Sequence, residues 1–358
     1  MKIMFVTHSM RFGGAERVMS LLSNEAVKRD NEIVLTIMDS EKILAYSLDD
    51  KIKIEFMPTP RFNKLGNLKK LINELREIIL RHSPDVIVSF WNFALTYSWL
   101  ATKGLGIPLV FSERNDPNNN IKGFKSKLFQ HFALKKSNHI VFQTEGARSY
   151  YGKKIHKKST VIINPFSVSN LPKAIDGERT KTIVSVGRFN AQKNQKLLIE
   201  AFSIVEKNHP EYRLVIYGEG SLRGSLESLI CEKGLSDKVF LPGADSNVLD
   251  KINSAAMFAF SSDFEGLPNA LIEAMMLGLP CISTDCSPGG ARELIDNYKN
   301  GIIVPCGDFN AMADAIEYVI SNPDAASAMG NEAKKLSLRT SVEHVFDEWY
   351  NIFEREFK

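Results

Sequence analysis

Short apolar runs alternate with longer amphipathic stretches along most of the chain. The apolar runs are rich in Val, Ile and Phe, which favours strands buried on both faces of a parallel sheet. The amphipathic stretches carry apolar residues at helical spacing. Strands that alternate with helices are typical of an α/β protein. The clearest predicted strands are KIMFVTH at residues 2–8, DVIVSF at 85–90, TIVSVG at 182–187 and PCISTD at 280–285.

This alternation is interrupted once, between Pro165 and Lys181, where the sequence is polar and has no periodicity. Pro172 and Gly177 fall in this stretch, as is usual for a linker. A chain of 358 residues is also long for one core. We therefore predict two doubly wound α/β domains, residues 1–170 and 171–340, that face each other across a cleft. Ligands of such sheets bind at the carboxyl ends of the strands.

The last segment, residues 341–358, predicts a helix with a large apolar face. Its apolar positions are Val342, Val345, Phe346, Trp349, Tyr350 and Phe353. An apolar face of this size needs a partner surface. We expect this helix to pack back on the first domain.

Composition excludes several classes of protein. Apolar residues make up 44% of the chain and charged residues 24%, which is ordinary for a globular protein in water. No stretch approaches the ~18 apolar residues of a membrane span, and the N-terminus lacks the pattern of a signal peptide. None of the four cysteines forms a CxxC pair, so we expect reduced thiols in the cytoplasm and no metal or disulfide. These cysteines are Cys231, Cys281, Cys286 and Cys306.

Charge is divided unevenly between the two halves. Up to residue 175 the chain has 27 Lys and Arg against 15 Asp and Glu, a net +12, whereas the remainder has 18 against 27, a net −9. The basic clusters, with aromatic residues nearby, are residues 64–70, 122–127, 135–136 and 153–158. They suit peripheral attraction to an anionic membrane surface or an acidic acceptor, and equally a solvated face. We expect no nucleic-acid partner.

The stretch from Phe260 to Asp285 is the richest in chemistry. Glu265 lies in a polar turn after an apolar run, and Glu273 lies eight residues later in an amphipathic segment that opens with Pro268. This pattern predicts a loop followed by a helix, which Gly278 ends. Glu273 then lies about a turn and a half inside the helix, whose N-terminus attracts phosphate.

Two cations follow the strand TIVSVG, at Arg188 and Lys193. At the carboxyl end of a parallel strand they are well placed to neutralise a diphosphate, Arg by a forked contact and Lys as a point charge. Gly13 and Gly14 follow the first strand in the same way. A double glycine suits either a phosphate-binding turn or close helix–strand packing, and it is not a GxGxxG fingerprint.

These segments together resemble the GT4 family of retaining glycosyltransferases. The matching segments, in order, are GGAER, GRFNAQKN, YGEGSLR and EGLPNALIEAMMLGLPCIST, the last with its two glutamates eight residues apart. The resemblance covers nearly the whole chain. It implies the GT-B fold of two Rossmann-like domains and a nucleotide-sugar donor held mainly by the second domain.

The resemblance also assigns roles to residues. Arg188 and Lys193 would hold the donor diphosphate and stabilise the charge of the leaving group without a metal. Glu273 would accept hydrogen bonds from the ribose hydroxyls, and Glu265 would lie at the sugar near the reacting carbon. Backbone N–H groups of the glycine turns would contact the diphosphate or the sugar. These turns are Gly13 with Gly14, and Gly266 with Leu267. Gly289 and Gly290 resemble another family loop near the donor.

The acceptor side departs from the family pattern. Many relatives carry a histidine in the first-domain loop that matches VFSERND, and this chain has Arg114 there, next to Glu113. Either Arg114 contacts the donor or Glu113 is the active group. His8, at the end of the first strand, is a third candidate, or a hydrogen-bonded structural residue.

The resemblance therefore implies a metal-independent, retaining transferase without a cofactor. It would move a sugar from a nucleotide-sugar, UDP-linked by family frequency, to a glycan carried on a polyprenyl diphosphate. Its place would be the inner face of the cytoplasmic membrane, in the synthesis of cell-surface polysaccharide or glycoprotein glycans. The alternatives are a sugar-nucleotide epimerase, a phosphorylase, or a nucleotide-binding relative without catalysis. The identity of the sugar depends on hydroxyl contacts from loops, which periodicity and motifs do not position.

Overall fold

The computed structural model of the chain describes residues 1–11, 13–39, 41–57, 65–114, 116–117, 131–167, 171–173, 175 and 177–356. The chain divides into two compact units. The first comprises Met1–Ser167 with Thr340–Lys358, and the second comprises Val168–Arg339. The predicted basic cluster at residues 122–127 and its helix lie outside the described residues.

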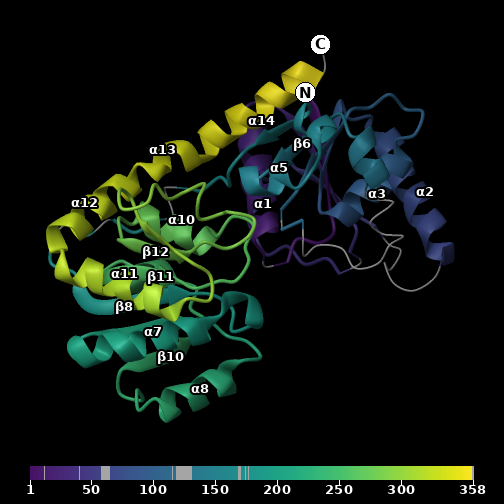
Figure 1. Cartoon of the computed structure of the whole chain (residues 1–358). Helices are drawn as coiled ribbons and strands as arrows, with labels where there is room; N and C mark the ends of the chain where they lie inside the picture. Colours follow the sequence, from purple (N-terminus) through teal and green to yellow (C-terminus); the bar gives the residue numbers. More distant parts are fainter. Residues whose placement is uncertain are drawn as a thin grey trace. The chain divides into compact units, whose positions relative to one another are not determined.

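The first unit is built on a parallel sheet of seven strands in the order β3-β2-β1-β4-β5-β6-β7 (Figure 1). The strands are β1 Lys2–Thr7, β2 Glu32–Ile37, β3 Lys53–Phe56, β4 Val86–Phe90, β5 Leu109–Ser112, β6 His139–Phe142 and β7 Ser159–Val161. The helices are α1 Gly14–Lys28, α2 Leu65–His82, α3 Asn92–Ala101, α5 Glu145–Ser149, α6 Lys153–His156 and α14 Val342–Glu356. The strand order reverses direction between β1 and β4.

The second unit repeats this plan with a parallel sheet of six strands in the order β10-β9-β8-β11-β12-β13. The strands are β8 Thr180–Val186, β9 Arg213–Tyr217, β10 Val239–Gly243, β11 Ala255–Phe260, β12 Cys281–Thr284 and β13 Ile302–Val304. The helices are α7 Gln195–Asn208, α8 Arg223–Glu232, α9 Val248–Ile252, α10 Asn269–Met276, α11 Phe309–Ser321 and α12 Pro323–Lys334, with a 3₁₀ turn, η2, at Ala191–Lys193. A short helix, α13 Leu336–Thr340, leads out of this unit. The predicted α/β class with two parallel sheets is confirmed.

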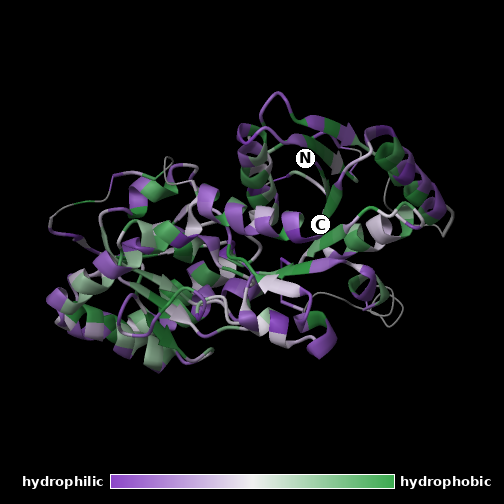
Figure 2. Ribbon diagram, turned by 90° about the horizontal axis from the view of Figure 1, so that it is seen from above, coloured by the Kyte–Doolittle hydropathy of each residue, from purple (hydrophilic) through white to green (hydrophobic). Residues whose placement is uncertain are grey.

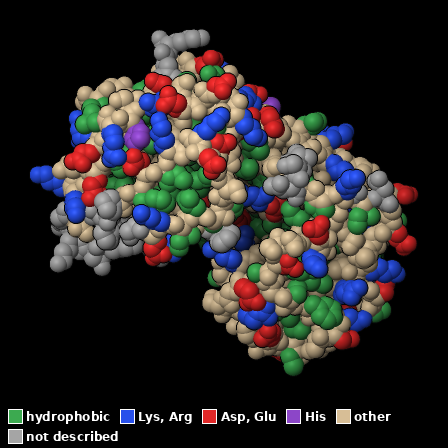
Figure 3. All heavy atoms as spheres, turned by 180° about the vertical axis from the view of Figure 1, so that it is seen from behind, with side chains coloured by type: hydrophobic (Ala, Val, Ile, Leu, Met, Phe, Trp, Pro, Cys, Tyr) green, Lys and Arg blue, Asp and Glu red, His purple; other side chains and the backbone are tan. Residues whose placement is uncertain are grey.

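The apolar runs of the sequence form the centres of both sheets. Every residue of β4 and of β12 is buried. Hydropathy colouring places the hydrophobic residues mainly on the strands and the hydrophilic ones on the outer helices and loops (Figure 2). On the face drawn in Figure 3, Lys and Arg side chains lie among Asp and Glu side chains. This face therefore carries charges of both signs.

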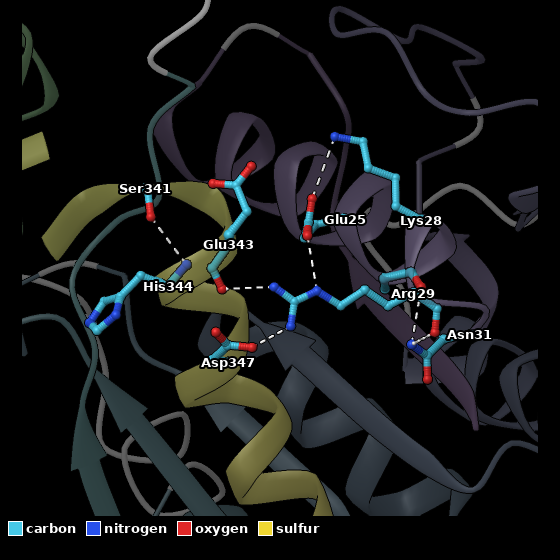
Figure 4. Close-up of polar contacts among 9 residues, drawn as sticks. Glu25, Lys28, Arg29, Asn31, Ser341, Glu343, His344 and Asp347 are labelled. Atoms are coloured by element: carbon cyan, nitrogen blue, oxygen red, sulfur yellow. Dashed lines mark hydrogen bonds and ion pairs between the residues drawn. The ribbon is translucent and has the colours of Figure 1, made fainter. Parts of the chain in front are cut away.

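Helix α14 belongs to the first unit and packs on α1. Trp349 is almost completely buried, and its ring stacks on Phe90 of β4 with centroids 6.3 Å apart. Arg29, which follows α1, ties the two helices together at the surface (Figure 4). It donates to Glu25 at 3.0 Å, to the carbonyl of Glu343 at 3.0 Å and to the carboxylate of Asp347.

Arg29 also packs on the apolar face of α14. Its guanidinium lies 5.0 Å from the ring centroid of Phe346. The ion pair with Asp347 is exposed, and exposed pairs contribute little to stability. The burial of Phe346 and Trp349 therefore stabilises the docked helix more than the ion pair does.

We predict that Trp349→Ala destabilises the first unit by about 3–5 kcal/mol, because it opens a cavity between α14 and β4. The matched control is Asn351→Ala, an exposed position two residues along the same helix. Urea denaturation followed by far-UV circular dichroism measures both variants. An equal midpoint for the two would contradict the docking of α14.

Candidate functional site

The candidate residues of the second unit gather at the switch point of its sheet. β8 and β11 are neighbours and run parallel, so the loops that follow them leave the sheet on the same edge. The first loop carries Arg188 and Lys193, and the second carries Glu265. The carboxyl edge at a switch point is where open α/β sheets bind ligands.

Lys193 and Glu265 form an ion pair between these two loops. Only 19% of the Lys193 side chain and 13% of the Glu265 side chain are exposed. The same oxygen of Glu265, Oε1, also accepts a hydrogen bond from Gln192 Nε2 at 3.0 Å. Partial burial strengthens such contacts because less water screens the charges. A cation and an anion thus lie side by side, where the sequence alone assigned them to different parts of a ligand.

Further hydrogen bonds hold the two loops together. The backbone N–H of Asp263 donates to the carbonyl of Gln192 at 2.9 Å, and Ser261 Oγ donates to the carbonyl of Lys193 at 3.0 Å. Asn194 Nδ2 donates to Asp263 Oδ1 at 2.8 Å. These bonds fix the loop backbones on both sides of the ion pair.

Two glycines in neighbouring loops, Gly290 after β12 and Gly218 after β9, allow those loops to pack closely on the two loops that carry the ion pair. A Cβ atom on Gly290 would lie 2.1 Å from the carbonyl oxygen of Gly266, and one on Gly218 would lie 1.9 Å from that of Gly187. Gly218 also has a φ of +151°, which other residues rarely adopt. The turn at Gly266 is held further by the N–H of Glu265, which donates to the carbonyl of Ser287 at 2.9 Å.

Arg188 differs from Lys193 in being exposed. Its carbonyl accepts a hydrogen bond from Gln195 Nε2 at 2.8 Å, which fixes the backbone at that position. Within the described part of the chain, its guanidinium forms no hydrogen bond or ion pair. The forked donor is therefore available to an anion in solution.

Glu273 lies in α10, a turn and a half from its start, as predicted. The helix begins at Asn269 after Pro268, which offers no side-chain cap, and Gly278 follows its end with a φ of +73°. The first N–H groups of the helix are therefore not satisfied by a capping side chain. Glu273 is half-buried.

The glycine turn of the first unit, Gly13 with Gly14, is hydrogen-bonded to a side chain of the same unit. Gly13 caps α1, and Gly14 is the first residue of that helix. The N–H of Gly13 donates to the hydroxyl of Tyr46 at 3.2 Å, and this hydroxyl donates to the carbonyl of Gly13 at 2.9 Å. His8 follows β1 on the same edge of the sheet. A ligand at Gly13 would have to share or replace the hydroxyl.

Arg114 and Glu113 follow β5 and are both buried. The guanidinium of Arg114 lies 4.6 Å from the ring centroid of Phe90 and 5.8 Å from that of Trp349. Its Nη1 donates to Asn164 Oδ1 at 2.8 Å, whereas Nε and Nη2 have no partner among the described residues. Burial lowers the pKa of Arg114 to about 9. Arg114 thus lies in the interior of the first unit, against α14.

Glu113 is held in the same interior. The hydroxyl of Tyr151 donates to Glu113 Oε2 at 3.3 Å. Burial and the neighbouring carboxylate raise the pKa of Tyr151 well above its usual range. A raised pKa keeps Tyr151 protonated, and so able to donate to Glu113, at neutral pH.

Sequence reasoning did not single out Gln192 and Tyr46. Gln192 lies in the segment GRFNAQKN, next to Lys193, and that proximity is the signal that could have identified it. Tyr46 lies far from Gly13 along the chain, and no local pattern connects them. In the ranges that the structure describes, no group of three or more His, Cys, Asp or Glu is arranged to hold a metal. None of the described helices is both long enough and apolar enough to cross a bilayer.

Two family models match consecutive parts of the chain. The model described as Glycosyltransferase Family 4 matches residues 12–169, and the one described as Glycosyl transferases group 1 matches residues 170–336. Together they account for most of both units.

Relatives of similar length support the same assignment. The chain is 27% identical over 362 residues, covering 98% of each chain, to a Campylobacter jejuni protein named GalNAc-alpha-(1->4)-GalNAc-alpha-(1->3)-diNAcBac-PP-undecaprenol alpha-1,4-N-acetyl-D-galactosaminyltransferase. It is 28% identical over 354 residues, 93% of this chain and 94% of the relative, to a second protein of that organism. That protein is named N-acetylgalactosamine-N,N'-diacetylbacillosaminyl-diphospho-undecaprenol 4-alpha-N-acetylgalactosaminyltransferase.

Among solved structures, Anabaena Alr3699/HepE in complex with UDP matches with a TM-score of 0.84 at 18% identity. The match covers 99% of this chain and 100% of that one, and it shows that the fold is GT-B. The consecutive family matches, the relatives and the two parallel-sheet units lead to one conclusion: the chain belongs to the GT4-type glycosyltransferases and is an enzyme of that family.

Proposed function

We propose that this glycosyltransferase is a metal-independent, retaining enzyme that uses a UDP-sugar. The observation that carries the proposal is the half-buried pair of Lys193 and Glu265, together with the exposed Arg188 on the same loop as Lys193. This arrangement offers two cations to a diphosphate and one carboxylate to hydroxyl groups. A nucleotide-sugar carries both kinds of group next to each other.

In the proposed reaction, the bond between the sugar's anomeric carbon and the diphosphate oxygen breaks as a bond to the acceptor oxygen forms on the same face. The acceptor's proton passes to the departing phosphate oxygen. Lys193 and Arg188 stabilise the negative charge that develops on the diphosphate. No protein base is required for this route.

The carboxylates position the donor. Glu265 accepts hydrogen bonds from sugar hydroxyls near the reacting carbon, and Glu273 accepts them from the ribose. When a diphosphate binds, Lys193 exchanges part of its contact with Glu265 for the phosphate oxygens. Gln192 then keeps Glu265 in place, because its Nε2 also donates to the carbonyl of Phe264 at 2.9 Å and so stays anchored.

We further propose that the acceptor is a glycan linked to a polyprenyl diphosphate at the inner face of the cytoplasmic membrane. The names of both Campylobacter jejuni relatives include undecaprenol joined through a diphosphate, which supports this class of acceptor. The net charge of +12 over residues 1–175 supports peripheral attraction to an anionic surface. His8 and Glu113 stay candidates for the acceptor side. The burial of Arg114 favours a structural role for that residue.

We predict that Lys193→Ala and Arg188→Ala each lower kcat/KM for transfer by about 10²–10³-fold, because each removes a cation from the departing diphosphate. UDP binding, measured by calorimetry, should weaken in both. Lys196→Ala is the control, since Lys196 is an exposed lysine one residue into α7 whose ammonium pairs with Glu200 at 3.7 Å. Activity is measured across UDP- and GDP-sugars with a polyprenyl-diphosphate-linked acceptor. Wild-type turnover in Lys193→Ala would overturn the proposed role.

Removal of divalent metal should leave the rate of transfer unchanged, because Arg188 and Lys193 supply the positive charge. The measurement is transfer with excess EDTA compared with transfer in added Mg²⁺ or Mn²⁺. NMR of the product should show the anomeric configuration of the donor. A rate that falls to background in EDTA and recovers with metal would contradict metal independence.

Gly290→Ala should weaken UDP binding by at least tenfold and cost about 1–3 kcal/mol of stability, because the new methyl group pushes the Gly266 turn out of place. Gly224→Ala serves as the control, since a Cβ there meets nothing within 4 Å. Calorimetry with UDP and thermal denaturation measure both effects. Equal UDP affinity in the two variants would argue against a role for the Gly266 turn in donor binding.

A further inference from the structure

A cavity of about 550 Å³ lies in the second unit, at the opposite edge of its sheet from Lys193 and Glu265. Its lining includes residues at the beginnings of β8 and β11, such as Arg179, Lys181 and Ala256. The candidate donor site, by contrast, follows the carboxyl ends of these same strands. The cavity is therefore separate from that site. Its volume lies within the ~300–1,000 Å³ typical of ligand pockets.

One part of the cavity wall is apolar. Met257 of β11 is buried, and Val319 and Ile320 come from the end of α11. Ile175, from the stretch before β8, is 37% exposed beside them. These side chains give the cavity an apolar side on which an apolar group can be buried.

The other part is polar and comes mainly from one face of α12. Ser327, Asn331 and Lys334 are spaced four and three residues apart, so they lie on the same side of the helix. Lys334 is half-buried, and its side chain crosses Gly278, where a Cβ would come within 2.2 Å of its Cε. Among the residues that the structure describes, the ammonium group of Lys334 forms neither a hydrogen bond nor an ion pair, although its backbone carbonyl accepts one from Ser337 Oγ at 2.8 Å.

Among the described residues of the lining, basic side chains outnumber acidic ones. Arg179 donates to the carbonyls of Asn253, Ala255 and Gly278 at 2.9–3.1 Å and so holds the wall in shape. Lys181 is an exposed cation at the rim and pairs with Glu211 at 3.7 Å, and Glu178 is the one acidic residue among the described residues of the lining. A half-buried ammonium without an anion, next to an apolar wall, suits a ligand that combines both features.

We propose that this cavity binds a small amphiphilic anion: an apolar or aromatic body with one carboxylate, phosphate or sulfonate group. The anionic group contacts Lys334, Ser327 and Asn331, and the body covers Ile175 and Met257.

The test uses the anionic dye 8-anilinonaphthalene-1-sulfonate on the full-length chain with saturating UDP, which occupies the donor site. Dye fluorescence gives the affinity. Lys334→Gln should weaken binding about tenfold, and Ser327→Trp should abolish it by filling the cavity from an exposed position. The matched control is Ala328→Trp, which adds the same bulk at the next residue of α12, outside the lining.

The neutral dye N-phenyl-1-naphthylamine separates charge from apolar burial. Its affinity should be unchanged by Lys334→Gln and lost in Ser327→Trp. Far-UV circular dichroism checks that each variant is folded. If Ser327→Trp does not fold, Lys334→Gln alone tests the proposal, because it should weaken binding of the anionic dye and leave the affinity of the neutral dye unchanged. Equal affinity of the anionic dye for Lys334→Gln and the unmodified chain, or for Ser327→Trp and Ala328→Trp, would overturn the proposal.

Discussion

The parallel pairing of β8 with β11 is the contact on which the candidate site depends. It brings together two loops that lie about seventy residues apart in the chain, one with Lys193 and one with Glu265. The loops are then joined by backbone bonds and by Gln192, so the two charges are positioned before any ligand arrives. Such preorganisation is the main way in which a protein stabilises charge that develops during a reaction.

The ion pair that results explains why Lys193 and Glu265 can both stay charged where little water reaches them. Each neutralises the other, and each side chain is mostly covered. A ligand with phosphate and hydroxyl groups offers both charges new partners at once. Binding of such a ligand therefore exchanges contacts and does not leave a bare ion in a partly buried site.

The order of strands and helices could be predicted from the sequence because periodicity is a local property. The helix that carries Glu273 could be predicted too, since Pro268 and Gly278 mark its ends. The ion pair of Lys193 with Glu265 could not, because no local pattern links two loops on different strands. Arg114 illustrates the same limit: its position beside Trp349 depends on where the last helix docks. The residue types indicated the chemistry, and the sheet topology determined which residues meet.

The return of α14 to the first unit has a consequence for biosynthesis. The second unit is one continuous stretch of chain, whereas the first unit needs its final segment, Thr340–Lys358, to cover Phe90 and Arg114. A ribosome makes that segment after the whole of the second unit. The first unit, although begun first, can therefore close only once the second unit has been synthesised, whereas the second unit has all of its own segments by then.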